Sequence, residues 1–441
     1  MWLIRVRETY SDYQMSQALE YIRKTGIKSL VQFSRSRRAE FVRDVSLGVC
    51  IPTFRRPERV VSLVNSILSS AELKQYVMKI YLVDQGGIHT MDDFIQDPRL
   101  FLYHQNNLGG SGGFSRAMRE AITDGCTHVL LMDDDVTVEA KTVKRVIHFF
   151  STLPAGLDIA ISGAMYSEEK PDYIYEAGAR LHPVSKNRLG AVRRLAGTLI
   201  VDKDDDPCLS EDWEIDYGAW FFFACAADVV HRVGFPLPLF IRGDDQEYGL
   251  RLKIHGVPTV CLPGLWVLHP SQSDKISKWH LYFHWRNVFI ITRLHRKMSP
   301  VGIRLELLRK IAYRWLGGQY DICQFIWEGW KDSKTWSASD NVDPEFALHK
   351  ALEIEKNGCA GIYSLDDLPV PIREIGDQRW PWWKEWIVFC LLNGRFFPKR
   401  KLDYLPVLRF NEYHWMKVRF LREYGIISKT DGQVKIYRLS Y

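Results

Sequence analysis

Short apolar runs that end abruptly in polar or glycine residues recur along the first part of the chain. Four of these runs predict strands: residues 45–51, 79–83, 100–104 and 129–132. Helical patterns lie between them, including one that ends near Leu68 and one from about Phe114 to Thr123. The alternation predicts an α/β fold with a mostly parallel, Rossmann-like sheet, in which ligands bind at the carboxyl ends of the strands.

The remaining patterns divide the chain into three parts. Residues 1–44 are predicted to be a short N-terminal extension, with one helix framed by Ser11 and Gly26. Residues 45–295 form the main domain, and residues 296–441 form a helical, basic, aromatic-rich C-terminal region. Apolar residues at helical spacing predict an amphipathic helix there: Ile303, Leu307, Leu308, Ile311, Trp315 and Leu316. A linker is expected near residues 332–344.

The charge of the chain is unevenly distributed. Its net charge is +6, but residues 271–320 hold ten Lys/Arg against two acids, and residues 391–420 hold seven against two. These basic segments, together with Trp380–Lys384, indicate attachment to an anionic membrane surface rather than binding of nucleic acid. A solvated basic face is the alternative explanation.

Features of targeting and redox chemistry point to the cytoplasmic side of the membrane. Charged residues interrupt the N-terminal segment Met1–Arg7 too early for a signal peptide. The apolar run Trp386–Leu392 is too short to span a bilayer, and the 8 Cys show no C-x-x-C spacing. We therefore expect a cytoplasmic protein that associates peripherally with the inner face of the cell membrane.

Three consecutive carboxylates, Asp133, Asp134 and Asp135, follow the predicted strand at residues 129–132. Adjacent carboxylates repel one another, so this cluster is costly unless a cation or hydrogen-bond donors neutralise it. Their hard oxygen atoms favour Mg²⁺ or Mn²⁺. A solvated loop that caps a helix is the simpler interpretation of the triplet taken alone.

A second acidic group and a histidine also follow apolar segments. Asp244, Asp245 and Glu247 open a predicted helix, where a capping residue would explain one acid but not all three. His269 ends the apolar run 265–268; taken singly it fits a structural histidine better than a metal ligand. Together these residues offer Asp133, Asp135 and His269 for a metal and Asp245 as a general base.

Two further segments have the chemistry of a nucleotide and sugar site. Glycines in residues 105–113 let backbone N–H groups approach phosphates, although a glycine hinge explains them equally well. Asp84 and Gln85 are placed to contact a base or ribose. The aromatic segment 217–226 predicts a strand, with either a core role or one face lining a cleft.

The order of these motifs is more specific than any one of them. They are Thr53–Pro57, Asn107–Phe114, Asp133–Asp135, Pro236–Ile241, Asp244–Arg251 and His269. In this order, over about residues 47–290, the chain resembles inverting glycosyltransferases of the GT-A fold (family 2 type), and within them the galactofuranosyltransferases that build mycobacterial galactan. The resemblance implies a GT-A catalytic domain and a single displacement with inversion at the anomeric carbon.

The resemblance also implies roles for particular residues. Asp245 would be the catalytic base, and Mn²⁺ or Mg²⁺ would bind Asp133, Asp135 and His269. The residues implied for the UDP-sugar donor are Arg56, Asp84, Gln85, Asn107, Gly109, Gly110, Asp133 and Asp134. Those implied for the acceptor and sugar pocket are Glu176, Trp220, Phe221 and Asp244.

We expect an enzyme that moves galactofuranose from UDP-galactofuranose to a lipid-linked or cell-surface glycan. Three departures from the mycobacterial polymerase of this family leave the donor and the product length open. Residues 1–44 cannot supply its large N-terminal β-rich domain, Phe221 replaces a second tryptophan, and the motif Arg242–Asp245 lacks the aromatic that precedes the acid pair. The alternatives are a rhamnosyltransferase that uses dTDP-rhamnose and a non-catalytic glycan-binding subunit of a polysaccharide assembly complex, which would need no base.

Overall fold

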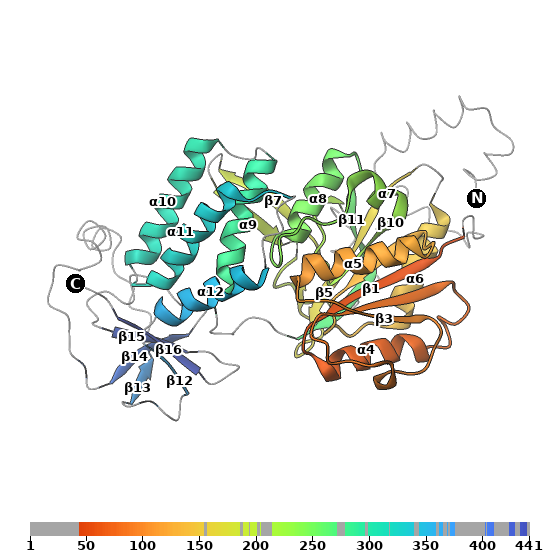
Figure 1. Ribbon diagram of the computed structural model, residues 1–441, viewed down its shortest axis with the longest axis horizontal. Helices are drawn as coiled ribbons and strands as arrows, with labels where there is room; N and C mark the ends of the chain where they lie inside the picture. The colour runs from red at the N-terminus through yellow and green to blue at the C-terminus, as the bar shows by residue number, and fades with distance from the viewer. Residues whose placement is uncertain are drawn as a thin grey trace. The chain divides into compact units, whose positions relative to one another are not determined.

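The computed structural model describes residues 44–153, 157–185, 188–193, 195–200, 203, 214–270, 278–295, 299–316, 318–338, 344–358, 361–364, 368, 371–374, 402, 404–409, 423–427 and 433–438. Its described parts form two compact units (Figure 1). Among the described residues, the first unit takes in those within 44–182, 190–240 and 244–270, and the second takes in those within 183–189, 241–243 and 278–438. The helix predicted between Ser11 and Gly26 and the segment Trp380–Lys384 lie outside the described residues.

A nine-stranded mixed sheet forms the centre of the first unit. Its strands are β1 (Leu47–Thr53), β2 (Met78–Asp84), β3 (Leu100–His104), β4 (His128–Met132), β5 (Ala160–Ser167), β6 (Ile174–Glu176), β9 (Glu214–Ile215), β10 (Phe222–Ala226) and β11 (Thr259–His269). The order is β3-β2-β1-β4-β10-β5-β11-β9, with β6 paired to β5. Strands β3, β2, β1 and β4 run parallel, as do β5 and β11, whereas β10 runs antiparallel between them.

Helices cover both faces of this sheet. They are α4 (Pro57–Ser69), α5 (Gly109–Thr123), α6 (Ala140–Thr152), α7 (Ala227–Val233) and α8 (Asp244–Ile254), with a short 3-10 turn at Met91–Asp93. Alternating strand residues face two separate cores. Val49 and Ile51 of β1 pack with α4 and α6, whereas Cys50 packs with α5, α7 and α8. Because both faces are covered, β1 is buried along its whole length, as the continuous apolar run predicts.

Strand β11 contains an irregularity that affects the site. Its pairing with β5 passes from Cys261 opposite Ser162 to Trp266 opposite Ala164, so five steps along β11 match two along β5. Gly264 lies within this interval at φ +78°, and its carbonyl accepts a hydrogen bond of 2.8 Å from Arg145 Nη1. The strand then resumes its parallel pairing and ends at His269.

The second unit contains four helices and a small sheet. The helices are α9 (His280–Leu294), α10 (Pro300–Leu316), α11 (Tyr320–Thr335) and α12 (Pro344–Gly358). Helices α9 and α11 approach closely at Gly329, where an added Cβ would lie 2.8 Å from the Arg286 nitrogen. Phe289, Leu307 and Ile326 form the centre of the helical core.

The small sheet has the order β12-β16-β15-β14-β13. Its strands are β12 (Gly361–Ser364), β13 (Ile372–Glu374), β14 (Leu405–Arg409), β15 (Glu423–Ile427) and β16 (Gln433–Arg438). Tyr437 connects β16 to the helices, because its hydroxyl receives a hydrogen bond from Lys278 Nζ at 3.0 Å and donates one to Asp321 at 3.2 Å. A two-stranded hairpin, β7 (Ala179–Ser185) and β8 (Arg188–Arg193), completes the described strands.

The predicted α/β architecture, with its mostly parallel sheet and helical C-terminal region, is confirmed. The amphipathic helix predicted over Ile303–Leu316 is α10. Three predictions are wrong in detail. Helix α5 begins at Gly109 instead of Phe114, the aromatic strand is limited to Phe222–Ala226, and Asp332 lies inside α11 instead of in a linker. The sheet of the C-terminal region was not predicted. No helix among the described residues is long and apolar enough to cross a membrane.

Candidate active site at the carboxyl ends of the strands

The acidic triplet leaves β4 at the edge where the parallel strands end. Asp135 Oδ1 lies 3.1 Å from His269 Nε2, and Asp133 Oδ2 lies 3.9 Å from the same nitrogen. One possible ligand atom from each of these residues lies within 4.8 Å of the others. Asp133 keeps 38% of its side-chain surface exposed, so this group opens toward solvent. The structure therefore brings together the three residues predicted to bind a metal.

The imidazole of His269 has a defined orientation. Its Nδ1 lies 2.6 Å from the Pro270 carbonyl oxygen, which can only accept a hydrogen bond. The proton is therefore on Nδ1, and Nε2 directs its lone pair toward Asp135 whenever the ring is neutral. A hydrogen bond of this kind from the second ring nitrogen is what orients histidine ligands in metal sites. The buried ring thus fits the metal-binding role.

Asp134 has a different environment from its two neighbours. Its carboxylate accepts a hydrogen bond of 2.7 Å from Thr53 Oγ1 and one of 3.0 Å from Arg56 Nη1. Arg56 Nη1 also pairs with Asp135. Asp134 is buried, and its contacts with Thr53 and Arg56 connect the end of β4 to the end of β1. The Arg56 side chain is 43% exposed and can still meet a phosphate.

The crowding of the acids changes their protonation. The partial burial of Asp133, then the charge of Asp135, raises the pKa of Asp133 to about 7. Burial would also raise the pKa of Asp135, but the hydrogen bond and charge of His269 outweigh it and lower that pKa. Burial would lower the pKa of His269, whereas Asp135 raises it. The three groups are thus held together partly by a proton, which a divalent cation can replace.

Asp84 organises the turn that follows β2. Its carboxylate accepts four backbone N–H groups, from Gly86, Gly87, Ile88 and His89, at 2.8 to 3.1 Å. Burial opposes ionisation here, yet these hydrogen bonds lower the pKa of Asp84. Both oxygens are occupied by the turn, so in this structure Asp84 shapes the turn after β2 and does not present a free acceptor to a base or ribose.

Gln85 and Asn107 hold the glycine-rich segment in place. Gln85 Oε1 accepts the Leu108 N–H at 2.8 Å, and its Nε2 donates to the Gly109 carbonyl at 3.0 Å. Asn107 Oδ1 accepts the Gly109 N–H at 3.0 Å. Asn107 Nδ2 has no partner among the described residues, so this amide remains a donor for a ligand, whereas Gln85 is used internally.

Glycines occupy the start of α5, and at two of these positions the surrounding chain leaves no room for a side chain. At Gly109, φ is +69° and an added Cβ would lie 2.3 Å from the Phe240 carbonyl oxygen. At Gly113 it would lie 2.5 Å from Pro52 Cβ. Gly110 has more space, 3.5 Å from Asp244 Oδ2, and its N–H has no partner among the described residues. The turn thus offers this N–H at a helix N-terminus.

The second acidic group lies beside this turn. Asp244 and Asp245 begin α8, where the helix dipole favours negative charge. Burial, then the charge of Asp245, raises the pKa of Asp244 to about 8. The preceding residues Phe240 and Arg242 have φ of 69° and 66°, a conformation that costs roughly 1–2 kcal/mol for each residue with a side chain.

The residues predicted for the acceptor and sugar pocket are largely interior. Trp220 and Phe221 are each 5% exposed, and Trp220 packs edge to face on Phe114 and Tyr248. The exposed remainder of either ring is too small for a sugar to stack on it, so in this structure both aromatics pack in the core. Glu176, at the end of β6, is also buried.

Three residues at the site lie in the motifs given above, but the sequence assigned no role to them. Thr53 supports the acid triplet, and Ser111 holds the Phe240 carbonyl through both its N–H, at 3.1 Å, and its hydroxyl, at 3.3 Å. Ser111 lies between paired glycines, and this spacing was the available signal. The role of Phe240 depends on a left-handed backbone conformation, which no sequence pattern announces in a residue with a side chain.

Comparison with known proteins relates the chain to glycosyltransferases. The model of the glycosyl transferase family 2 matches residues 48–201. The galactofuranosyltransferase GlfT2 of Mycobacterium tuberculosis is 32% identical over 268 residues, which cover 57% of this chain and 41% of that protein. The galactofuranosyltransferase GlfT1 of Mycolicibacterium smegmatis is 27% identical over 232 residues, 52% of this chain and 72% of that protein. The chain therefore spans less than half the length of GlfT2.

Solved structures are similar at lower identity. A mannosyltransferase from Pyrobaculum calidifontis, in complex with GDP-Man and Mn²⁺, gives a TM-score of 0.39 at 12% identity, over 80% of this chain and 93% of that one. GalNAc-T7 with UDP, GalNAc and Mn²⁺ gives 0.45 at 11%, over 70% and 54%. These scores are low, so the fold rests on the strand order given above. The matched segment, residues 48–201, is a member of glycosyl transferase family 2, and the chain is a distant relative of the mycobacterial galactofuranosyltransferases.

Proposed function

We propose that the protein is an inverting, metal-dependent glycosyltransferase that transfers galactofuranose from UDP-galactofuranose to a lipid-linked or cell-surface glycan. The observation that carries this proposal is the meeting of Asp133, Asp135 and His269 at the strand ends where a nucleotide would bind. A binding subunit would need neither these ligands nor an acid pair at α8. The galactofuranosyl donor is inferred from the relatives that match over more than half of this chain.

The metal group has a limited role that its residues fit. A Mn²⁺ or Mg²⁺ ion held by Asp133, Asp135 and His269 would supply positive charge for the departing diphosphate. Arg56, the Gly110 N–H and the Asn107 amide would contact the donor phosphates and ribose directly. Asp84, Gln85 and Asp134 would keep these groups in position through the hydrogen bonds described above.

The two acids of α8 would divide the remaining work. Because burial and the charge of Asp245 raise the pKa of Asp244 to about 8, the pair carries one negative charge near neutral pH, which we assign to Asp245. Asp245 would then take the proton from the attacking hydroxyl of the acceptor. Neutral Asp244 would donate a hydrogen bond to the sugar. General-base help of this kind accelerates a reaction by about 10²–10⁴-fold.

Donor profiling tests the proposal. Purified protein would be incubated with an acceptor extract and either UDP-galactofuranose, UDP-galactopyranose or dTDP-rhamnose, each with Mn²⁺, with Mg²⁺ and with a chelator. We expect nucleotide release from UDP-galactofuranose that depends on the cation. Release from dTDP-rhamnose alone would replace galactofuranose with rhamnose, and no release from any sugar nucleotide would favour a binding subunit.

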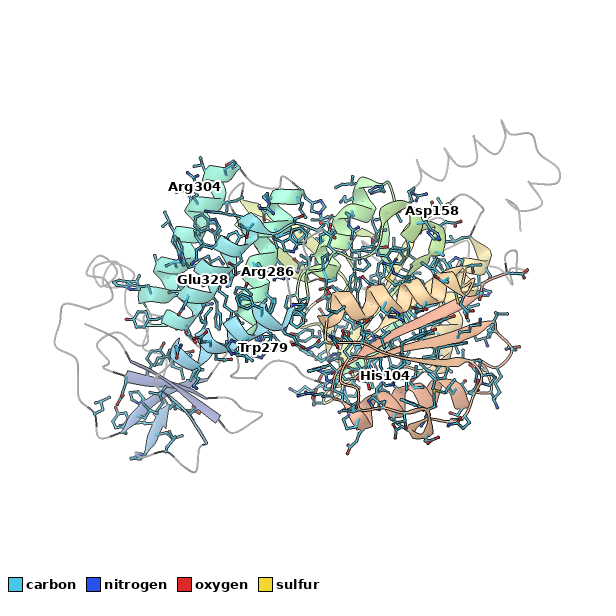
Figure 2. The ribbon with its side chains drawn as sticks, viewed as in Figure 1. His104, Asp158, Trp279, Arg286, Arg304 and Glu328 are labelled. Atoms are coloured by element: carbon cyan, nitrogen blue, oxygen red, sulfur yellow. The ribbon has the colours of Figure 1, made fainter. Side chains whose placement is uncertain are left out.

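We also propose that the protein associates peripherally with the cytoplasmic face of an anionic membrane, through α10. Large apolar residues on this helix are 38% to 64% exposed: Val301, Leu305, Leu308 and Trp315. Their spacing, with Ala312, places them along one stripe of the helix. Arg304 and Arg309 are exposed beside the stripe; Arg304 is labelled in Figure 2. An apolar stripe with basic flanks suits the surface of a bilayer that contains acidic lipid.

Vesicle binding tests this surface. The double variant Leu305→Gln/Leu308→Gln should weaken binding to phosphatidylglycerol vesicles by about 30-fold. Burial of the exposed parts of these two leucines in the membrane would contribute roughly 2 kcal/mol to the binding free energy. Leu352→Gln on α12 is the matched control, since Leu352 is also exposed but lies outside the stripe. Binding should weaken at high salt and be poor on neutral vesicles. Equal binding by both variants would contradict the assignment of α10.

A further inference from the structure

We infer that Asn287 of α9 is a positioning residue that holds the strained segment 240–243 and thereby sets where Asp244 and Asp245 stand. The catalytic part of this inference rests on the proposed function. Asn287 does not belong to any motif that the sequence singled out. Its amide nitrogen contacts Ile241 and Arg242, which belong to the same compact unit as α9.

The segment needs support because its backbone is unfavourable without contacts. Phe240, Arg242 and Gly243 have φ of 69°, 66° and 85°. Two of these residues carry side chains, so the left-handed conformation is not their intrinsic preference. A conformation of this kind persists only where surrounding contacts determine it. It is followed at once by the first residue of α8, Asp244.

Asn287 provides those contacts from a fully buried position. Its Nδ2 donates to the Ile241 carbonyl at 2.9 Å and to the Arg242 carbonyl at 2.7 Å. Its Oδ1 accepts a hydrogen bond of 3.0 Å from Nε of the neighbouring Arg286, which is labelled in Figure 2. Two carbonyls require the nitrogen on one side and the guanidinium requires the oxygen on the other. Only one orientation of the amide satisfies all three partners.

Gly243 also packs against the same turn of α9. An added Cβ there would lie 3.1 Å from Ile291 Cδ1 and 3.6 Å from Asn287 Cβ. At the other end of the segment, Ser111 of α5 holds the Phe240 carbonyl. The four residues before Asp244 are thus fixed at both ends, and Asn287 is the contact that acts on their two central carbonyls.

The test uses two variants and a control on the same helix. Asn287→Asp keeps the size of the side chain and the Arg286 contact but removes both N–H donors, and Asn287→Ala removes the whole group. Thr292→Val is the control, because buried Thr292 donates only to the Val288 carbonyl of its own helix, at 2.6 Å. Hydrogen–deuterium exchange of peptides that cover residues 239–246 is measured in the full chain, followed by donor turnover and UDP–Mn²⁺ affinity.

We expect both Asn287 variants to exchange at least about tenfold faster in 239–246, with peptides of β1 and β4 unchanged and Thr292→Val like the wild type. Turnover number should fall at least about tenfold while the UDP–Mn²⁺ affinity stays within about threefold, because the metal group stands on β4 and β11. Unchanged exchange in both variants overturns the inference, and so does faster exchange with normal turnover. If the wild type turns over no donor, the proposed function fails, and exchange alone then decides whether Asn287 holds the segment.

Discussion

Replacement of Gly109 by alanine should destabilise the fold far more than a surface glycine replacement does. At φ +69°, an alanine costs roughly 1–2 kcal/mol, offset by about 0.4–1 kcal/mol because the unfolded chain loses freedom. The new Cβ would also stand 2.3 Å from the Phe240 carbonyl oxygen, a backbone atom that cannot move aside alone. Overpacking of this kind costs about 1–3 kcal/mol, so we expect a total loss of about 2–4 kcal/mol.

Gly125→Ala separates the two causes. Gly125 has φ +81°, and no atom lies within 4 Å of an added Cβ, so only the backbone cost applies and the loss should be about 1 kcal/mol. Urea unfolding of both variants gives the two free energies, provided that the m-values match the wild type. If Gly109→Ala loses no more than Gly125→Ala, the close approach of α5 to Phe240 has no energetic weight and the reasoning is refuted.

Three further results are expected. Chelation should stop donor turnover until Mn²⁺ is restored, and His269→Ala should need at least about tenfold more Mn²⁺ for half-maximal rate; an unaltered requirement would remove His269 from the ligands. Asp245→Asn should lose about 10²–10⁴-fold in turnover number, whereas Asp244→Asn, which resembles the protonated acid present below its pKa of about 8, should stay within about tenfold; equal losses would refute the division of roles. Asp84→Asn should lower the free energy of unfolding by about 2–3 kcal/mol near neutral pH, because an amide can accept only part of the four N–H groups. The pKa of Asp84 in the fold lies below 3.8, so this stabilisation is complete above that value and vanishes as the pH falls through the lowered pKa. A difference in stability between wild type and variant that persists in strong acid would contradict this reasoning.

The elements that the sequence predicted well are those whose apolar period is uninterrupted. The strands that end at Thr53, Asp84 and Met132 were found within two residues, and α8 was placed at Asp244, because burial on both faces or a helical period leaves a local trace. The predicted start of helix α5 lies too far along the chain, because its N-terminal glycines resemble a loop. Their reason lies in Phe240 and Pro52, which are distant along the chain.

The sequence predicted the charged residues of the site more completely than the residues that hold them in place. Asp133, Asp135 and His269 come together because the acids follow β4 and the histidine ends β11, and both strands end at the same edge of the sheet. The sequence could not show that Asp84 and Gln85 form hydrogen bonds with the backbone, or that Trp220 and Phe221 are buried. Hydrogen-bond partners and burial depend on tertiary packing, and so does the formation of the strands of the small sheet.

The interrupted pairing of β11 decides which side of the sheet receives its last residue. In an unbroken strand, Cys261 and His269 would point the same way, because they are eight residues apart. Between them β5 advances only from Ser162 to Ser167, an odd number of steps, so the extra residues around Gly264 turn His269 to the opposite side. Anyone who transplants these ligands into another scaffold, or trims this strand by a single residue, must therefore carry the irregularity along or lose the histidine from the acids' side.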